Sequence, residues 1–126
     1  MKKDFTLPCF DVEIASTLSE LSNEGGESLI TELYDLYSKS SPVILLAIEN
    51  AFHKKDASGI QKQAHSLKSS SGSLGLLQMQ ERCEFLEKNA NSVVAANEVF
   101  VIDELKLCFH KSLKLLKEYA GQKKVA

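Results

Sequence analysis

The segment that decides the fold is AHSLKSSSGSLG, residues 64–75. Together with Ile60, which precedes the segment, its apolar and small residues recur at spacings of four and three. This spacing is one face of an α-helix: Ile60, Ala64, Leu67, Ser71 and Leu74. At about 100° per residue, His65 points roughly 140° away from the middle of that face. The pattern therefore predicts that the His65 imidazole meets water while the opposite side of the helix is buried.

Apolar periodicity predicts helices along the whole chain, at about residues 11–21, 27–54, 57–74, 76–89 and 97–119. Asp11 and Asp56 are the expected N-caps of the first and third helices. Pro42 lies inside the second and predicts either a kink or a short break followed by a new helix. The Asn-Ala-Asn-Ser stretch at 89–92 predicts a loop, and the tail 121–124 is expected to fray.

Long amphipathic helices joined by short polar loops indicate an all-α fold, an up-and-down antiparallel four-helix bundle with an additional short N-terminal helix. Antiparallel neighbours bury each apolar stripe with the least connecting chain. At 126 residues the chain is long enough for one domain with a substantial core. We therefore expect a single bundle domain over residues 1–126, and a monomer, because the apolar stripes are expected to close on one another.

The composition argues against several classes of protein. Hydrophobic residues at 44% and charged residues at 25% are ordinary for a soluble globular protein. A net charge of −2 gives no reason to expect nucleic acid or an acidic membrane as partner. No apolar run approaches the roughly 20 residues of a membrane span, and none resembles a signal peptide. Three scattered cysteines indicate a reducing compartment, here the cytoplasm, and small buried side chains: Cys9, Cys83 and Cys108.

His65 has two interpretations. One is a solvated surface histidine; the other is a nucleophile, because a neutral imidazole nitrogen is nucleophilic near physiological pH. Phosphorylation would place close to two negative charges on the helix, and Lys68, three residues on, is within reach of a phosphate there. The side chains around this point are small or polar and suit a flat approach by another protein. The residues expected to bind that partner are Gln61, Ser69, Gly72 and Ser58.

The run Ala64-His65-Ser66-Leu67-Lys68, followed by small residues and then Leu74-Gly75, resembles the histidine-containing phosphotransfer (HPt) domain family. That family's pattern reads Ala-His-x-Leu/Ile-Lys-Gly, then two small residues, and a few positions on a hydrophobic residue and Gly. Downstream, Cys83 and Leu86-Glu87 fall where members often carry a Cys or Ala and a Leu-Glu pair, and the resemblance covers about residues 28–90. Ser69 departs from the usual Gly, which predicts altered partner preference while the chemistry survives.

The resemblance implies a phosphorelay intermediate without autokinase activity. A receiver domain carrying an aspartyl phosphate docks over the helix, Nε2 of His65 takes the phosphoryl group, and a second receiver removes it. The implied partners are receiver domains of hybrid sensor kinases and response regulators. No cofactor is expected on this chain, because the receiver is expected to bring the Mg²⁺. The sequence also contains no glycine-rich phosphate loop of the kind that a kinase would need.

Two other classes stay open. The first is an adaptor bundle that binds a receiver without phosphotransfer; degenerate adaptors would be expected to lose the histidine, and this chain keeps His65 and Lys68. The second is a metal-binding or ligand-binding bundle. Glu49 and His53 share a helix face at i, i+4, but no second pair completes a site, so no metal is expected. The start at Met1 favours a free-standing protein over a fragment of a hybrid kinase.

Overall fold

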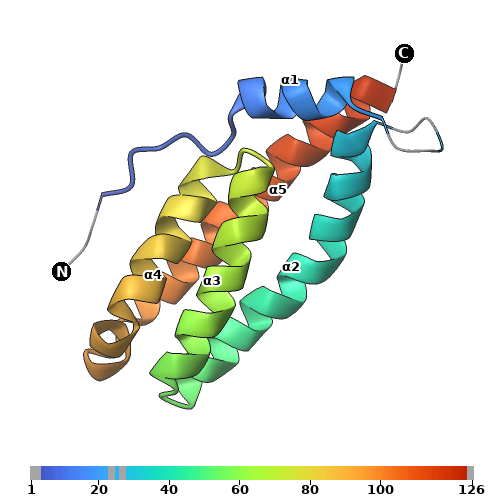
Figure 1. Cartoon of the computed structure of the whole chain (residues 1–126). Coiled ribbons are helices and arrows are strands. Elements are labelled where there is room, and N and C mark those ends of the chain that lie inside the picture. The colour runs from blue at the N-terminus through green and yellow to red at the C-terminus, as the bar shows by residue number, and fades with distance from the viewer. Residues whose placement is uncertain (1–3, 23–24, 26–27, 125–126) are drawn as a thin grey trace.

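The computed structural model describes residues 4–22, 25 and 28–124, and of residues 122–124 the backbone alone. Apart from an isolated bridge between Ser22 and Ser28, the regular elements in these residues are helices. In chain order they are α1 (Val12–Glu20), α2 (Leu29–His53), α3 (Ala57–Ser73), α4 (Leu77–Ala95) and α5 (Val99–Lys124). Helices α2 to α5 run alternately up and down, and α1 lies across the end where α3 turns into α4 (Figure 1). The predicted all-α bundle with a short N-terminal helix is confirmed.

The predicted end of the fourth helix near residue 89 coincides with a break in regular helical geometry, but the loop predicted over residues 89–92 is wrong. Helix α4 continues to Ala95 through a kink at Asn89, where φ is −117° and ψ is 17°. The Asn89 side-chain amide donates to the Phe85 carbonyl at 2.8 Å. The helix continues because Ala90 and Val93 are fully buried and extend its apolar stripe beyond the polar stretch. The Asn-Ala-Asn-Ser signal thus marks a bend, and the chain reverses only after residue 95.

The fifth helix was predicted at 97–119, and the structure places it at Val99–Lys124, so the backbone of the tail is helical and not frayed. Ala120 is buried, and the Tyr119 ring packs against Phe10 with centroids 5.4 Å apart. These contacts hold the last turns, and extending a formed helix is much easier than starting one. The predicted start of the second helix at residue 27 lies outside the described residues.

Helix α2 runs through Pro42 without interruption, so the alternative of a break and a new helix is wrong. Pro42 lies at the surface, where water is available to the carbonyl that loses its helical donor.

Both predicted N-caps are confirmed. The Asp11 carboxylate accepts from the Glu13 amide, and the Asp56 carboxylate from the Gly59 amide, each at 2.9 Å.

The turn after α3 brings α1 onto the bundle. Leu76 donates its amide to the Ser71 carbonyl at 3.0 Å and Gly75 donates to Gly72 at 3.1 Å, the paired bonds of a Schellman C-cap. Gly75 has a φ of 77°, which glycine adopts without steric cost. A Cβ there would also lie 3.0 Å from the Asp11 carbonyl oxygen. Gly75 therefore both ends α3 and admits the start of α1.

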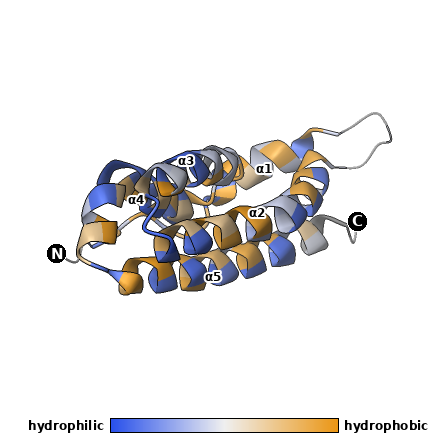
Figure 2. Cartoon of the chain, turned by 90° about the horizontal axis from the view of Figure 1, so that it is seen from below, coloured by the Kyte–Doolittle hydropathy of each residue, from blue (hydrophilic) through white to orange (hydrophobic). Residues whose placement is uncertain are grey.

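A single core lies between the helices. Along α2 and α5 apolar and polar residues alternate, so that each helix has an orange and a blue side (Figure 2). The buried face predicted for α3 is confirmed, with five residues at most 2% exposed: Ile60, Ala64, Leu67, Ser71 and Leu74. All three cysteines are free; Cys83 and Cys108 are buried, whereas Cys9 is only half-buried.

One polar contact joins α2 to α3 inside this core. The Tyr37 hydroxyl lies 2.8 Å from Ser71 Oγ, and both residues are buried. Burial raises the pKa of Tyr37, so its hydroxyl stays protonated and available as a donor. Ser71 therefore bonds across the bundle to a side chain, and this partner was invisible in the local sequence of α3.

We expect Tyr37→Phe and Ser71→Ala each to lower the free energy of unfolding by about 1–3 kcal/mol, because each leaves a buried hydroxyl without this partner. The double variant should lose about 0.5–2 kcal/mol less than the sum of the two, since it removes both hydroxyls together. Urea denaturation of the four proteins measures this coupling. Strict additivity would show that the contact contributes nothing to stability.

Candidate functional site

His65 lies near the middle of α3, on the side opposite its buried face. Its side chain is 62% exposed, as the periodicity of the sequence predicts. Neighbours Ala64 and Leu67 are fully buried and anchor the helix, so the ring is presented from a rigid support. In Figure 1, α3 lies between α2 and α4 and is not covered by either. The imidazole is therefore accessible to another protein.

Glu87 of α4 orients the ring. Its Oε1 lies 2.9 Å from Nδ1 of His65. The Lys68 ammonium and, to a lesser degree, the His65 ring lower the pKa of Glu87, so it is a carboxylate at neutral pH. A carboxylate only accepts hydrogen bonds, so Nδ1 must carry the proton. In the neutral ring the lone pair then sits on Nε2, the nitrogen that does not face Glu87.

Lys68 shares that carboxylate with the histidine. Its Nζ lies 2.8 Å from Oε2 of Glu87, and Glu87 raises the pKa of Lys68 and keeps it charged. The sequence predicted an ammonium beside His65 that is within reach of a phosphate. In the structure the Lys68 ammonium does lie beside His65, but it is already paired with Glu87. It contacts Oε2 of that carboxylate, while Oε1 contacts the His65 ring.

The four residues expected to bind a partner form a row along α3 with His65. Helix geometry puts positions four and seven residues before and after His65 within about 40° of it around the axis. Ser58 and Ser69 are exposed, and Gln61 and Gly72 are half-exposed. The Ser69 hydroxyl donates to the His65 carbonyl at 3.3 Å. Apart from Gln61, the row carries only small side chains, and the Gln80 side chain of α4 lies against Gly72.

Glu87 is the site residue that sequence reasoning missed. It was noted only as part of a Leu-Glu pair downstream of the histidine. One signal was available: buried Cys83 and Leu86 set the inward face of α4, which leaves Glu87 at the border of that face. Its pairing with His65, however, depends on how far α3 is shifted along α4. That shift cannot be predicted from the residue pattern of α4 alone.

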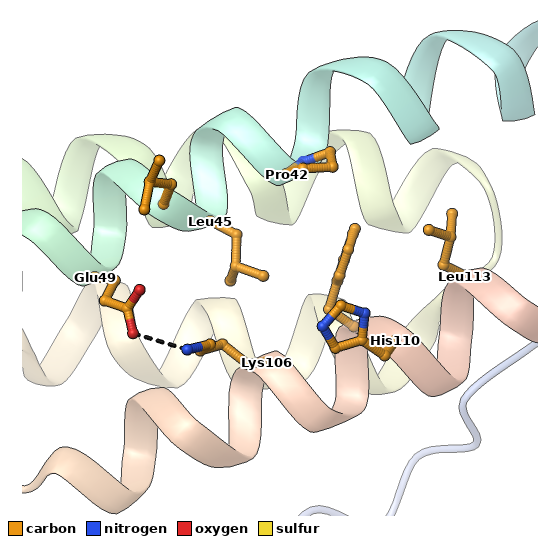
Figure 3. Close-up of a pocket in the computed structure, with 8 residues that line it drawn as sticks. Pro42, Leu45, Glu49, Lys106, His110 and Leu113 are labelled. Atoms are coloured by element: carbon orange, nitrogen blue, oxygen red, sulfur yellow. Dashed lines mark hydrogen bonds and ion pairs between the residues drawn. The ribbon is translucent and has the colours of Figure 1, made fainter.

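A hollow of about 310 Å³ lies between α2 and α5, away from His65. Pro42 and Leu45 of α2 and Leu113 of α5 line it, and Glu49 pairs with Lys106 across it at 2.8 Å (Figure 3). Glu49 is thus engaged by a lysine, and no three metal-ligating side chains converge anywhere in the described residues. Helix α2 also carries three exposed apolar side chains, and the last of them lines the hollow: Leu36, Val43 and Leu46.

Comparisons with known proteins show the family and the fold of this chain. The family model of the Hpt domain matches residues 32–118, and the chain belongs to this family of histidine-containing phosphotransfer domains. The fold is similar to that of a solved structure, histidine-containing phosphotransfer protein B (HptB) from Pseudomonas aeruginosa PAO1. The TM-score is 0.78 at 21% identity, covering 93% of this chain and 98% of that one. No curated protein sequence matches the chain.

Membership of the Hpt family implies histidine phosphotransfer within a phosphorelay, and such domains generally interact with receiver domains. They are typically not kinases. None of the helices in the described residues has the length and apolar character needed to cross a membrane.

Proposed function

We propose that this chain accepts a phosphoryl group on Nε2 of His65 from the aspartyl phosphate of one receiver domain and passes it to another. The observation that supports this is the exposed ring whose Nδ1 is held 2.9 Å from Glu87. In the neutral ring that contact leaves the lone pair on Nε2, and the side chain is 62% exposed. Positioning dominates phosphoryl transfer, so one oriented nucleophile on a rigid helix is a sufficient contribution from this side.

The transfer balances without a proton leaving the chain. The Nε2 lone pair forms the N–P bond while the P–O bond to the receiver's aspartate breaks, and that aspartate departs as a carboxylate. The imidazole becomes cationic because Nδ1 keeps its proton. Glu87 accepts the hydrogen bond from that proton throughout and stabilises the positive charge. The return step reverses these changes with a second receiver.

The remaining parts of the proposal concern the partners and the setting. Receiver domains of hybrid sensor kinases and of response regulators supply and remove the phosphoryl group, and the receiver brings the Mg²⁺. The small or polar row of Ser58, Gln61, Ser69 and Gly72 contacts the receiver. We take residues 1–126 as one domain that acts as a monomer in the cytoplasm, where its three free thiols would stay reduced.

Incubation with a phosphorylated receiver domain tests the function. We expect radiolabel to move to this chain and to be acid-labile and alkali-stable, as phosphohistidine is and phosphoserine is not. Adding a second, unphosphorylated receiver should then remove the label. A chain that binds receivers without taking label from any of them would be an adaptor, and the proposal would be wrong.

We expect Lys68→Ala to slow transfer, or to shorten the lifetime of the phosphohistidine, by about two- to tenfold. The effect should be modest because the ammonium is close to solvent, and exposed ion pairs contribute little. Single-turnover kinetics and the decay of the label measure it. Lys114→Ala, at an exposed lysine of α5, is the matched control. If the two variants behave alike, Lys68 has no part in transfer.

A further inference from the structure

The residues before α1 form an extended strap, residues 4–10, tied along α4. Its backbone is held at Leu7, whose amide donates to Glu81 Oε2 and whose carbonyl accepts from Gln78 Nε2, both at 3.1 Å. The Gln78 amide donates to the Pro8 carbonyl at 2.9 Å. In Figure 1 this segment leaves α1 and runs on the α4 side of the bundle. The strap is therefore a fixed part of the surface.

An aromatic contact anchors the start of the strap. The Phe5 ring meets Phe85 of α4 edge-on, with centroids 5.7 Å apart. The Arg82 guanidinium lies 4.3 Å from the centre of the same Phe5 ring, a cation–π arrangement. The four positions from Phe5 to Pro8 are thus held by an aromatic contact at one end and backbone hydrogen bonds at the other.

Held in this way, Leu7 shares a hollow with Lys68 of the candidate site. Leu7 is 42% exposed, and it borders a hollow of about 240 Å³ that Lys68 also lines. The remaining walls come from one stretch of α4: Gln80, Glu81 and Glu84. Lys68 is one helical turn from His65, about 4.5 Å along the axis. The hollow is therefore continuous with the surface around the histidine.

A typical protein interface is large enough that a partner docked on His65 would also cover this hollow. A standard interface covers about 800 Å² on each side, which is a disc of roughly 16 Å radius. A receiver centred on His65 thus covers the Lys68 side of α3 and the hollow behind it. Glu81 and Glu84 line the hollow, against the single ammonium of Lys68, which is itself paired with Glu87. Glu84 pairs in turn with the exposed Lys88 at 3.3 Å, so three carboxylates (Glu81, Glu84 and Glu87) face two ammonium groups here. The hollow is acidic and has one apolar edge, at Leu7.

We propose that the strap is part of the receiver-docking surface and that this hollow takes a lysine or arginine side chain of the receiver. The aliphatic stem packs on Leu7, and the cationic end reaches Glu84 and Glu81. The inference rests on the proposed function, because that function supplies the receiver. It adds a determinant of partner choice outside the histidine helix, on a segment far from it in sequence.

Leu7→Ala and Glu84→Lys test the docking surface, with Leu107→Ala and Glu118→Lys on α5 as matched controls; Leu107 is 70% exposed. The probe is an unphosphorylated receiver domain that binds the wild-type chain. By titration calorimetry we expect Leu7→Ala to raise Kd about three- to tenfold. We expect Glu84→Lys to raise it by a similar factor that shrinks as salt is added. The controls should match wild type.

The outcomes separate this inference from the function it rests on. If wild type takes label and both test variants bind like their controls, the docking inference is wrong and the phosphotransfer function stands. If wild type binds receivers with this Kd pattern yet takes no label, the docking surface stands and the phosphotransfer function is wrong. If no receiver binds the wild-type chain, both are wrong.

Discussion

His65→Gln is expected to abolish labelling by a phosphorylated receiver and to leave the fold intact. Glutamine keeps a polar side chain of similar length but has no nucleophilic lone pair on nitrogen, because its amide nitrogen is conjugated with the carbonyl. The side chain is 62% exposed, so the substitution removes no core contact. Glutamine also favours helices at least as well as histidine, so the free energy of unfolding should change by less than about 0.5 kcal/mol. Far-UV circular dichroism and urea denaturation check the fold.

The two other histidines provide the controls. His53 at the end of α2 and His110 on α5 are both exposed, as His65 is. His53→Gln and His110→Gln should take label at the wild-type rate, because the side chains that pair with Glu87 are His65 and Lys68. Label that persists in the His65→Gln protein, or that is lost in one of the controls, would remove His65 from the mechanism.

Glu87→Ala should slow phosphoryl acceptance about 10- to 100-fold without abolishing it. The substitution frees the ring to rotate and to exchange its proton between Nδ1 and Nε2. In fewer encounters with the receiver does the Nε2 lone pair then point at the phosphorus. Misplacement of a reacting group by about 1 Å is enough for an effect of this size. The variant also loses the carboxylate that stabilises the cationic ring after transfer. Single-turnover kinetics with a saturating phosphorylated receiver measure the step.

Glu49→Ala is the matched control for this variant. Glu49 holds Lys106 at 2.8 Å, as Glu87 holds Lys68, and both glutamate side chains are 27% exposed. A general cost of deleting a surface ion pair would therefore appear in both variants. We expect Glu49→Ala to transfer at the wild-type rate. Equal rates for the two variants, or a wild-type rate for Glu87→Ala, would contradict the orienting role.

The pH dependence provides a second check on Glu87. Because Lys68 and His65 lower the pKa of Glu87 from its ordinary value of 4.5, its contribution to stability is present above that value and is lost as pH falls through the lowered pKa. Between about pH 6 and 8 the carboxylate is ionised throughout. The loss of stability in Glu87→Ala, measured by urea denaturation, should therefore be present near pH 7 and vanish below the lowered pKa.

The sequence predicted well whatever depends on neighbours along one helix. The periodicity from Ile60 to Leu74 predicted the buried face of α3 and the exposure of His65, and both are observed. The caps at Asp11 and Asp56 are likewise local, because the side chain bonds an amide two or three residues on. The error at Asn89 came from the same local reasoning. A polar stretch predicts a loop unless buried residues beyond it, here Ala90 and Val93, keep the helix in the core.

Contacts between helices were decided only by the tertiary structure. Glu87 meets His65, and Tyr37 meets Ser71, across gaps of 22 and 34 residues. Each pairing depends on how far one helix is shifted along its neighbour and how far each is rotated. Core packing and the Gly75 turn set that shift, and no spacing within a single helix contains it. The chain alone therefore singled out His65 as the candidate nucleophile and predicted its exposed face, whereas the fold determined which of its ring nitrogens faces Glu87.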